Sequence, residues 1–166
     1  MAWSSKARAF WPLLSTAFLA DCATKRIATE HLRPAYTPHE VWGDWVRFIL
    51  AYNRNAAMSM PVGPWARPLL ALVAVVMLGL LWAWYRRTER RDWATAAALG
   101  LIAGGALGNL LDRLRWDRGV VDFIDIGIGA TRFWIFNVAD AAITCGAVWL
   151  VWRLSRSGKR SEPAAA

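Results

Sequence analysis

The side chains best suited to chemistry are carboxylates inside or beside strongly apolar segments. Asp140 lies within the apolar residues 133–152, where an ionisable group costs ~2.5–3.5 kcal/mol on membrane-insertion scales. In a helix, Asn137, Asp140 and Thr144 share one face, because residues three and four apart are neighbours. The alternative is that Asp140 caps a helix N-terminus. The residues before it are already apolar, so we favour a functional role.

A second carboxylate is expected in the outer connection that precedes this segment. Asp122 and Asp125 both lie in a short run with apolar flanks, Val-Val-Asp-Phe-Ile-Asp at 120–125. Spacing alone does not choose between them, and many loop aspartates only form turns. Two carboxylates that converge in a low-dielectric site share one proton, because both do not ionise together. Such a pair activates water with one member and protonates a carbonyl oxygen with the other.

A further polar group ends the apolar residues 93–111. Asn109, Asp112 and Arg113 follow one another on the expected helix. Adjacent opposite charges predict an interfacial ion pair between Asp112 and Arg113. We expect this group to brace the outer end of the helix near Asp140, and we favour this structural role over direct catalysis.

No motif in the chain indicates a metal or cofactor site. The sequence contains two His and two Cys. It has neither the H-E-x-x-H pattern of zincin proteases nor the G-x-S-x-G turn of serine hydrolases. We therefore expect catalysis with no metal and no cofactor.

The composition is that of an integral membrane protein. Of the 166 residues, 57% are hydrophobic, 12 are Trp and only 19% are charged, and a soluble domain of this size does not hide so much apolar surface. A membrane-spanning helix needs ~20 apolar residues. Four segments meet or approach this requirement, at 9–29, 68–85, 93–111 and 133–152.

The first segment has two interpretations. It begins with basic residues and reaches Cys22 through small residues, as a secretory signal peptide does. Asp21 directly precedes this cysteine, where cleavage normally requires a tiny side chain. We therefore predict a retained membrane helix.

The distribution of charge predicts the orientation. The net charge is +8, but the basic residues flank apolar runs and form no exposed stripe, which favours a membrane surface over nucleic acid. Ten of the 20 Lys and Arg residues lie in the N-terminus, the short loop 86–91 and the tail. By the positive-inside rule both termini and this loop are cytoplasmic. The polar tail 155–166 is predicted to be disordered.

The outer connections, 30–67 and 112–132, contain signs of a small sheet. Residues 45–52 and 119–129 are rich in β-branched and aromatic residues, which favours strands at the outer membrane face. Within the third apolar segment Gly100, Gly104 and Gly108 are four apart, which predicts close helix packing.

Five short blocks, in order along the chain, resemble the signature of the lipoprotein signal peptidases (signal peptidase II). They are D-C-A-T-K at 21–25, N-R-N-A-A-M-S at 53–59, G-G-A-L-G-N-L-L-D-R at 104–113, V-V-D-F at 120–123 and F-N-V-A-D at 136–140. The resemblance spans most of the chain, and the ordered set is far more specific than any one block.

This resemblance implies an all-α integral membrane fold, with four transmembrane helices and a small extracytoplasmic β-cradle. It implies an aspartic endopeptidase of the bacterial inner membrane that cuts diacylglyceryl-modified prolipoproteins just before the lipidated Cys. The catalytic dyad would be Asp122 and Asp140, which selects Asp122 over Asp125. Substrate-binding or supporting roles fall to Asn53, Asn109, Asp112, Arg113 and Asn137, and structural roles to Asp21 and Lys25.

We therefore expect one membrane peptidase domain over residues 1–154, acting as a monomer at the outer face and inhibited by globomycin. Its partners would be prolipoproteins and membrane lipids, with no nucleic acid. Two rival functions are a small proton-conducting transporter and a membrane scaffold held by glycine packing. The transporter predicts acids near the bilayer midplane, and the scaffold predicts that both aspartates tolerate Asn.

Overall fold

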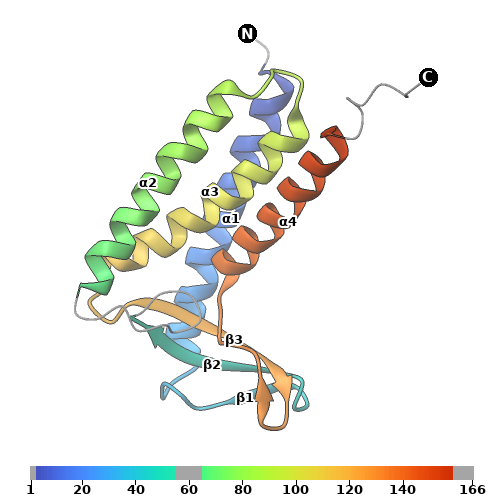
Figure 1. Cartoon of the computed structure of the whole chain (residues 1–166). Helices are drawn as coiled ribbons and strands as arrows, with labels where there is room; N and C mark the ends of the chain where they lie inside the picture. Colours follow the sequence, from blue (N-terminus) through green and yellow to red (C-terminus); the bar gives the residue numbers. More distant parts are fainter. Residues whose placement is uncertain (1–2, 55–64, 159–166) are drawn as a thin grey trace.

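The computed structural model describes residues 3–54 and 65–158 of the chain. Four helices lie side by side, and an antiparallel sheet crosses one end of them (Figure 1). The helices are α1 (Ser5–His31), α2 (Ala66–Arg87), α3 (Trp93–Arg115) and α4 (Val138–Gly158). The strands are β1 (His39–Trp42), β2 (Val46–Asn53), β3 (Val120–Ile128) and β4 (Thr131–Arg132).

Helix α3 is the centre of the bundle. In its most apolar window 67% of the residues are buried inside the protein, against 11% in α2 and 17% in α4. The apolar side chains of α2 and α4 therefore point outward, as lipid-facing helices require. Within the described residues, α2, α3 and α4 are long and apolar enough to cross a membrane.

Glycines bring α1 and α3 into backbone contact. A Cβ atom added at Gly100 would collide with the carbonyl oxygen of Phe10, and one at Gly104 with that of Leu14. Only glycine permits so close an approach. The predicted packing role of these glycines is confirmed.

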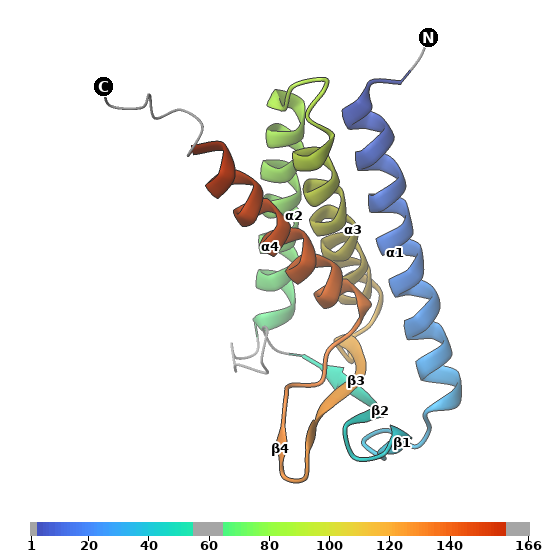
Figure 2. The same cartoon turned by 90° about the vertical axis from the view of Figure 1, so that its right-hand side faces the viewer.

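The sheet has the order β1-β2-β3-β4. Its centre is the antiparallel pair β2–β3, in which Asp122 lies opposite Ala51 and Val120 opposite Asn53. Both strands predicted from sequence, at 45–52 and 119–129, are confirmed, whereas the two short outer strands were not predicted. Figure 2 shows that β3 and β4 form a hairpin projecting past the lower end of α4.

The predicted start of the fourth helix was wrong. Helix α4 begins at Val138, not at residue 133, because the preceding chain pairs with β3. The amide of Phe136 donates to the carbonyl of Ile124 (N···O 3.0 Å), and the amide of Ile124 donates back (2.8 Å). The other end was also misplaced, since α4 continues to Gly158 through the start of the tail predicted to be disordered; residues 159–166 lie outside the described part.

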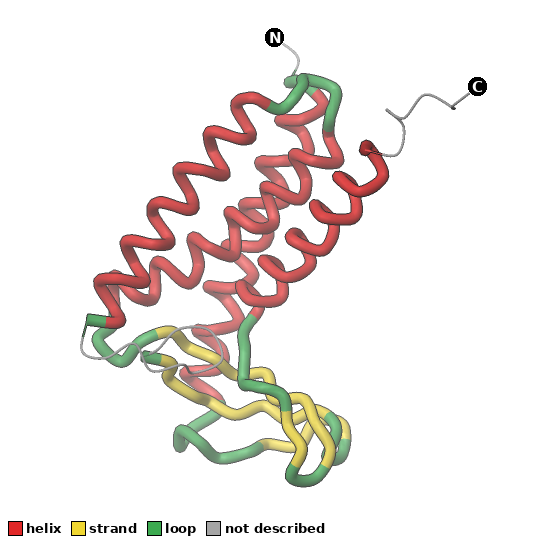
Figure 3. Tube along the Cα trace, in the orientation of Figure 1, coloured by secondary structure: helices red, strands yellow, loops and turns green. Residues whose placement is uncertain are grey.

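Both ends of the bundle are distinct. The start of α1, the end of α4 and the α2–α3 loop lie together at one pole of the bundle. The sheet lies at the opposite pole (Figure 3). The candidate carboxylates are in β3 and in the first turn of α4, so they meet where bundle and sheet join.

Candidate active site

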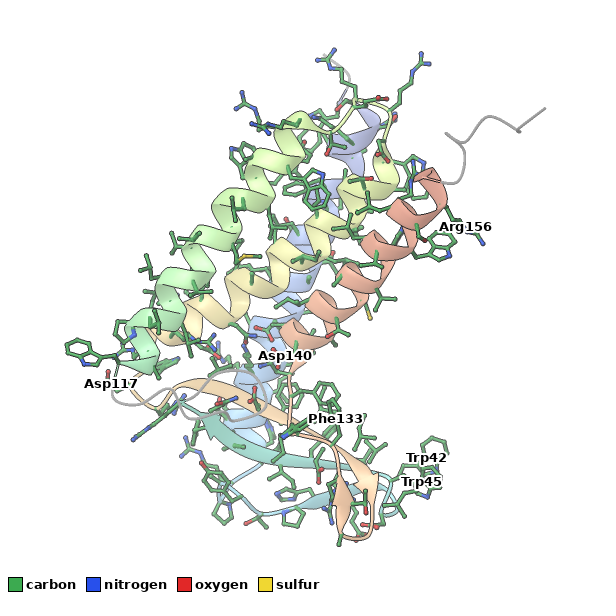
Figure 4. The ribbon with its side chains drawn as sticks, in the orientation of Figure 1. Trp42, Trp45, Asp117, Phe133, Asp140 and Arg156 are labelled. Carbon is green, nitrogen blue, oxygen red and sulfur yellow. The ribbon has the colours of Figure 1, made fainter. Side chains whose placement is uncertain are left out.

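A cavity of about 300 Å³ opens at the junction of bundle and sheet. Figure 4 labels Asp140 at this junction, on the first turn of α4 above the sheet. Asp122 from β3 lines the same cavity, so the structure brings together the two carboxylates that the sequence singled out. The other lining residues are Asn53, Asn109, Arg113, Val120, Phe133, Trp134, Ile135, Phe136, Ile143 and Thr144.

Asp140 is also part of a helix cap. Its Oδ2 accepts from the backbone amide of Asn137 (3.2 Å), and the Oδ1 of Asn137 accepts from the backbone amide of Asp140 (3.0 Å). This reciprocal pair is a capping box, with the two residues at the N-cap and N3 positions. The capping alternative is therefore confirmed, and a cap leaves the same carboxylate free to line the cavity. Asn137 precedes the helix and is not on its face.

Asp122 is buried and held by two amides. Its Oδ1 accepts from Asn137 Nδ2 (2.6 Å) and its Oδ2 from Asn53 Nδ2 (3.1 Å). Burial, followed by the negative charge of Asp140, raises the pKa of Asp122 to about 7. The two amide hydrogen bonds oppose this shift because they stabilise the ionised form. Asp122 therefore exchanges its proton near neutral pH.

Two asparagines link the carboxylates to each other. Asn109 donates from Nδ2 to Oδ1 of Asp140 (2.8 Å), and its own Oδ1 accepts from Asn137 Nδ2 (3.1 Å). Because Asn137 also donates to Asp122, the amides form a continuous bridge between β3, α3 and α4. Hydrogen bonds that connect side chains in this way hold them in fixed positions.

Behind the asparagines lies a buried lysine. Lys25 Nζ is 2.8 Å from Asp21, 3.0 Å from Asp112 and 2.8 Å from Asn109 Oδ1. Since this Oδ1 accepts a hydrogen bond from Lys25, the NH₂ group of Asn109 must face Asp140. Lys25 thus determines how the Asn109 amide is oriented.

The two carboxylates paired with Lys25 extend the network into the backbone. Asp21 Oδ1 accepts from the amide of Ala139 (2.9 Å), beside Asp140, and Asp112 Oδ2 accepts from the amide of Val121 (3.1 Å), beside Asp122. Each member of the candidate dyad is therefore next to a backbone amide tied to the same lysine. The predicted Asp112–Arg113 ion pair was wrong, because Asp112 turns into the bundle toward Lys25.

Arg113 faces the cavity and donates to the carbonyl oxygen of Asn109 (3.1 Å).

Asp125, the alternative to Asp122, has a different environment, between Arg47 (3.0 Å) and Arg132 (2.8 Å). Its burial disfavours ionisation, but hydrogen bonds from both arginines outweigh that effect and lower its pKa. Asp125 is a structural anion within the sheet. Of the second sequence block, Asn53 lies at the cavity, and residues 55–59 are outside the described part.

The family model for signal peptidase (SPase) II matches residues 13–156. The chain belongs to the signal peptidase II family. The peptidase is 41% identical to the lipoprotein signal peptidase of Xylella fastidiosa (strain M12), over 83% of each chain. It is 40% identical to that of Pseudomonas putida KT2440, over 94% of this chain and 92% of the relative.

Two solved structures share the fold of the peptidase, and each is described as a bacterial membrane enzyme. One has a TM-score of 0.81 at 24% identity and covers 93% of this chain and 92% of its own. The other has a TM-score of 0.75 at 26% identity and covers 86% and 89%. The peptidase is accordingly a membrane protease of the signal peptidase type.

The apolar wall of the cavity was missed by sequence reasoning. Residues 133–136 form this wall with Ile143, but they had been assigned to a membrane helix. Their aromatic character was visible in the sequence. Their position depends on the pairing of Phe136 with β3, for which the sequence carries no local signal.

Proposed function

We propose that this peptidase is an aspartic endopeptidase that removes the signal peptide from diacylglyceryl-modified prolipoproteins. The curated relatives are lipoprotein signal peptidases, which supports this substrate class. The observation that carries the mechanism is the shared cavity of Asp122 and Asp140, joined by hydrogen-bonded amides. Cleavage would occur just before the lipidated Cys.

In this mechanism the dyad holds one proton. The ionised carboxylate takes a proton from water, while the protonated one gives its proton to the carbonyl oxygen of the scissile peptide. The water oxygen bonds to the carbonyl carbon and forms a tetrahedral intermediate. The C–N bond then breaks as the carboxyl that gained the water proton passes it to the leaving nitrogen, while a hydroxyl of the intermediate returns its proton to the other carboxylate. The raised pKa of Asp122, about 7, suits a group that exchanges protons at neutral pH.

The polar neighbours would have supporting roles. Asn109 and Asn137 hold the carboxylates in place through the bonds described above, and Asn53 holds Asp122. Arg113, which lines the cavity beside both acids, is placed to contact the substrate backbone or stabilise negative charge. Asp21, Lys25 and Asp112 support the network from inside the bundle.

We further propose four membrane crossings, with α1 as the fourth span, within one domain that extends to the end of α4 rather than to residue 154. The charged side chains Asp21 and Lys25 of α1 are buried against α3 and avoid lipid, as intramembrane charges do. The basic pole with both termini would face the cytoplasm and the sheet would lie outside the inner membrane. The substrate would then enter from the outer leaflet, with its acyl chains against the apolar wall. We also propose, from the family resemblance alone, that the peptidase acts as a monomer and is inhibited by globomycin.

The test compares Asp122→Asn and Asp140→Asn with Asp117→Asn in a gel-shift assay on a lipid-modified prolipoprotein. Asp117 is exposed at the same pole (Figure 4) and pairs only with Arg67 in the described residues. We expect each dyad variant to lose processing by at least about 10³-fold while still inserting in the membrane, and Asp117→Asn to retain it. Normal processing by either dyad variant would remove that residue from the dyad. A precursor without lipid should be cut poorly, and equal cleavage of both forms would contradict a lipid-reading site.

A further inference from the structure

A second cavity lies at the pole opposite the sheet. It has a volume of about 280 Å³ and is lined by the start of α1 and by the α2–α3 loop. Figure 1 shows these two segments together at the end of the bundle away from the sheet. The lining residues of the cavity are Trp3, Ser4, Ser5, Arg8, Arg90 and Arg91. The proposed proteolysis involves none of them, because the dyad is at the other end of the helices.

We call this cavity the arginine pocket. Lys6 joins its two walls, the start of α1 and the α2–α3 loop. Its ammonium group donates to the carbonyl oxygens of Tyr85 (2.9 Å) and Thr88 (2.7 Å), and its backbone amide donates to the carbonyl of Arg90 (3.1 Å). The ammonium also lies 4.8 Å from the centre of the Tyr85 ring. These bonds connect α1 to the loop, so the pocket exists before any ligand arrives.

The charge of the arginine pocket is uncompensated. Within residues 3–54 and 65–158, Arg8, Arg90 and Arg91 form no ion pair with a carboxylate. Two acids lie in the same loop. Glu89, beside Arg90, forms no ion pair within the described residues, and Asp92 caps α3 through the amide of Thr95 and lies 3.7 Å from Arg153. Three guanidinium groups with two serine hydroxyls form a set of donors that matches a phosphate group.

The depth of the arginine pocket in a bilayer indicates which phosphate compounds it would meet. Exposed tryptophans surround the same pole, and such residues lie at the headgroup level of a bilayer. They are Trp3, Trp84, Trp93 and Trp152. A pocket at this depth meets lipid headgroups at high local concentration. We propose that the arginine pocket binds the phosphate of an anionic phospholipid.

The experiment measures lipid binding to the full chain in detergent micelles, by native mass spectrometry with phosphatidylglycerol or phosphatidylcholine. The pocket variant is Arg8→Gln with Arg91→Gln. The matched control is Arg86→Gln with Arg87→Gln, which removes the same charge from exposed arginines outside the pocket. We expect phosphatidylglycerol to bind the wild type and the control alike, and the pocket variant to bind about fivefold more weakly for each arginine removed.

Three outcomes would overturn the proposal. Equal weakening in both variants would indicate general attraction to a basic surface. Equal binding of phosphatidylcholine would exclude a site selective for anionic lipid. Displacement of the lipid by inorganic phosphate at similar concentration would identify a free-phosphate site instead. Because proteolysis is not the readout, the result is independent of the dyad.

Discussion

The hydrogen bond from Asn53 to Asp122 should control the pH range of catalysis. It joins Asn53 Nδ2 to Oδ2 of Asp122 at 3.1 Å and stabilises the ionised carboxylate. Hydrogen bonds to charged groups contribute ~1.5–3 kcal/mol, and one pKa unit corresponds to about 1.4 kcal/mol. Asn53 is half-buried, so water replaces part of the lost bond. We expect Asn53→Ala to raise the pKa of Asp122 by about 0.5–1 unit.

The direction of the change follows from the shared proton. The dyad needs one proton, and Asp122, with a pKa of about 7, loses it as the pH rises. In the wild type kcat/KM should therefore fall above about pH 7. In Asn53→Ala this fall should begin at a higher pH. The fall is a property of the pair and not of one carboxylate.

The assay is kcat/KM for a lipid-modified peptide between about pH 5 and 10. Thr144→Ala is the matched control, since Thr144 lines the same cavity but forms no hydrogen bond to either carboxylate within the described residues. A lower maximum of kcat/KM that still falls at the same pH would mean that Asn53 only contacts substrate. If kcat/KM of Asn53→Ala falls at the same pH as in the wild type, or at a lower pH, the assigned role of this bond is refuted.

Three further substitutions test the supporting structure by thermal unfolding in detergent. Lys25→Met leaves two buried carboxylates without their cation and should destabilise by ~3–5 kcal/mol; an unchanged Tm would contradict this. Gly108→Ala drives a methyl group into the Asp21 carboxylate and should cost ~1–3 kcal/mol, whereas Gly79→Ala, which meets open space, should be neutral or slightly stabilising. Asp125→Asn breaks two arginine pairs and should cost ~1–3 kcal/mol at neutral pH. Because its pKa is lowered on folding, the difference from wild type should persist down to about pH 4 and vanish only in stronger acid.

Much of the fold was predictable because its signals are local. Each apolar segment long enough to form a helix did so, and both β-rich segments became the central strands. The start of α4 was not predictable, because Phe133 to Phe136 are as apolar as a membrane helix. Their backbone pairs with β3 instead, and that pairing depends on residues distant in sequence.

The candidate site divides in the same way. The sequence by itself determined that Asp140 and an aspartate of 120–125 were unusual, because a carboxylate among apolar residues is costly wherever it lies. Spacing left Asp122 and Asp125 open and the family resemblance selected Asp122; the tertiary structure gives the physical reason, since Asp125 is paired with two arginines away from the cavity. It also decided the distant partners of Lys25, whose hydrogen bond to Asn109 spans 84 residues. A hydrogen bond over such a separation depends on the packing of α1 against α3, and no spacing along the chain encodes it.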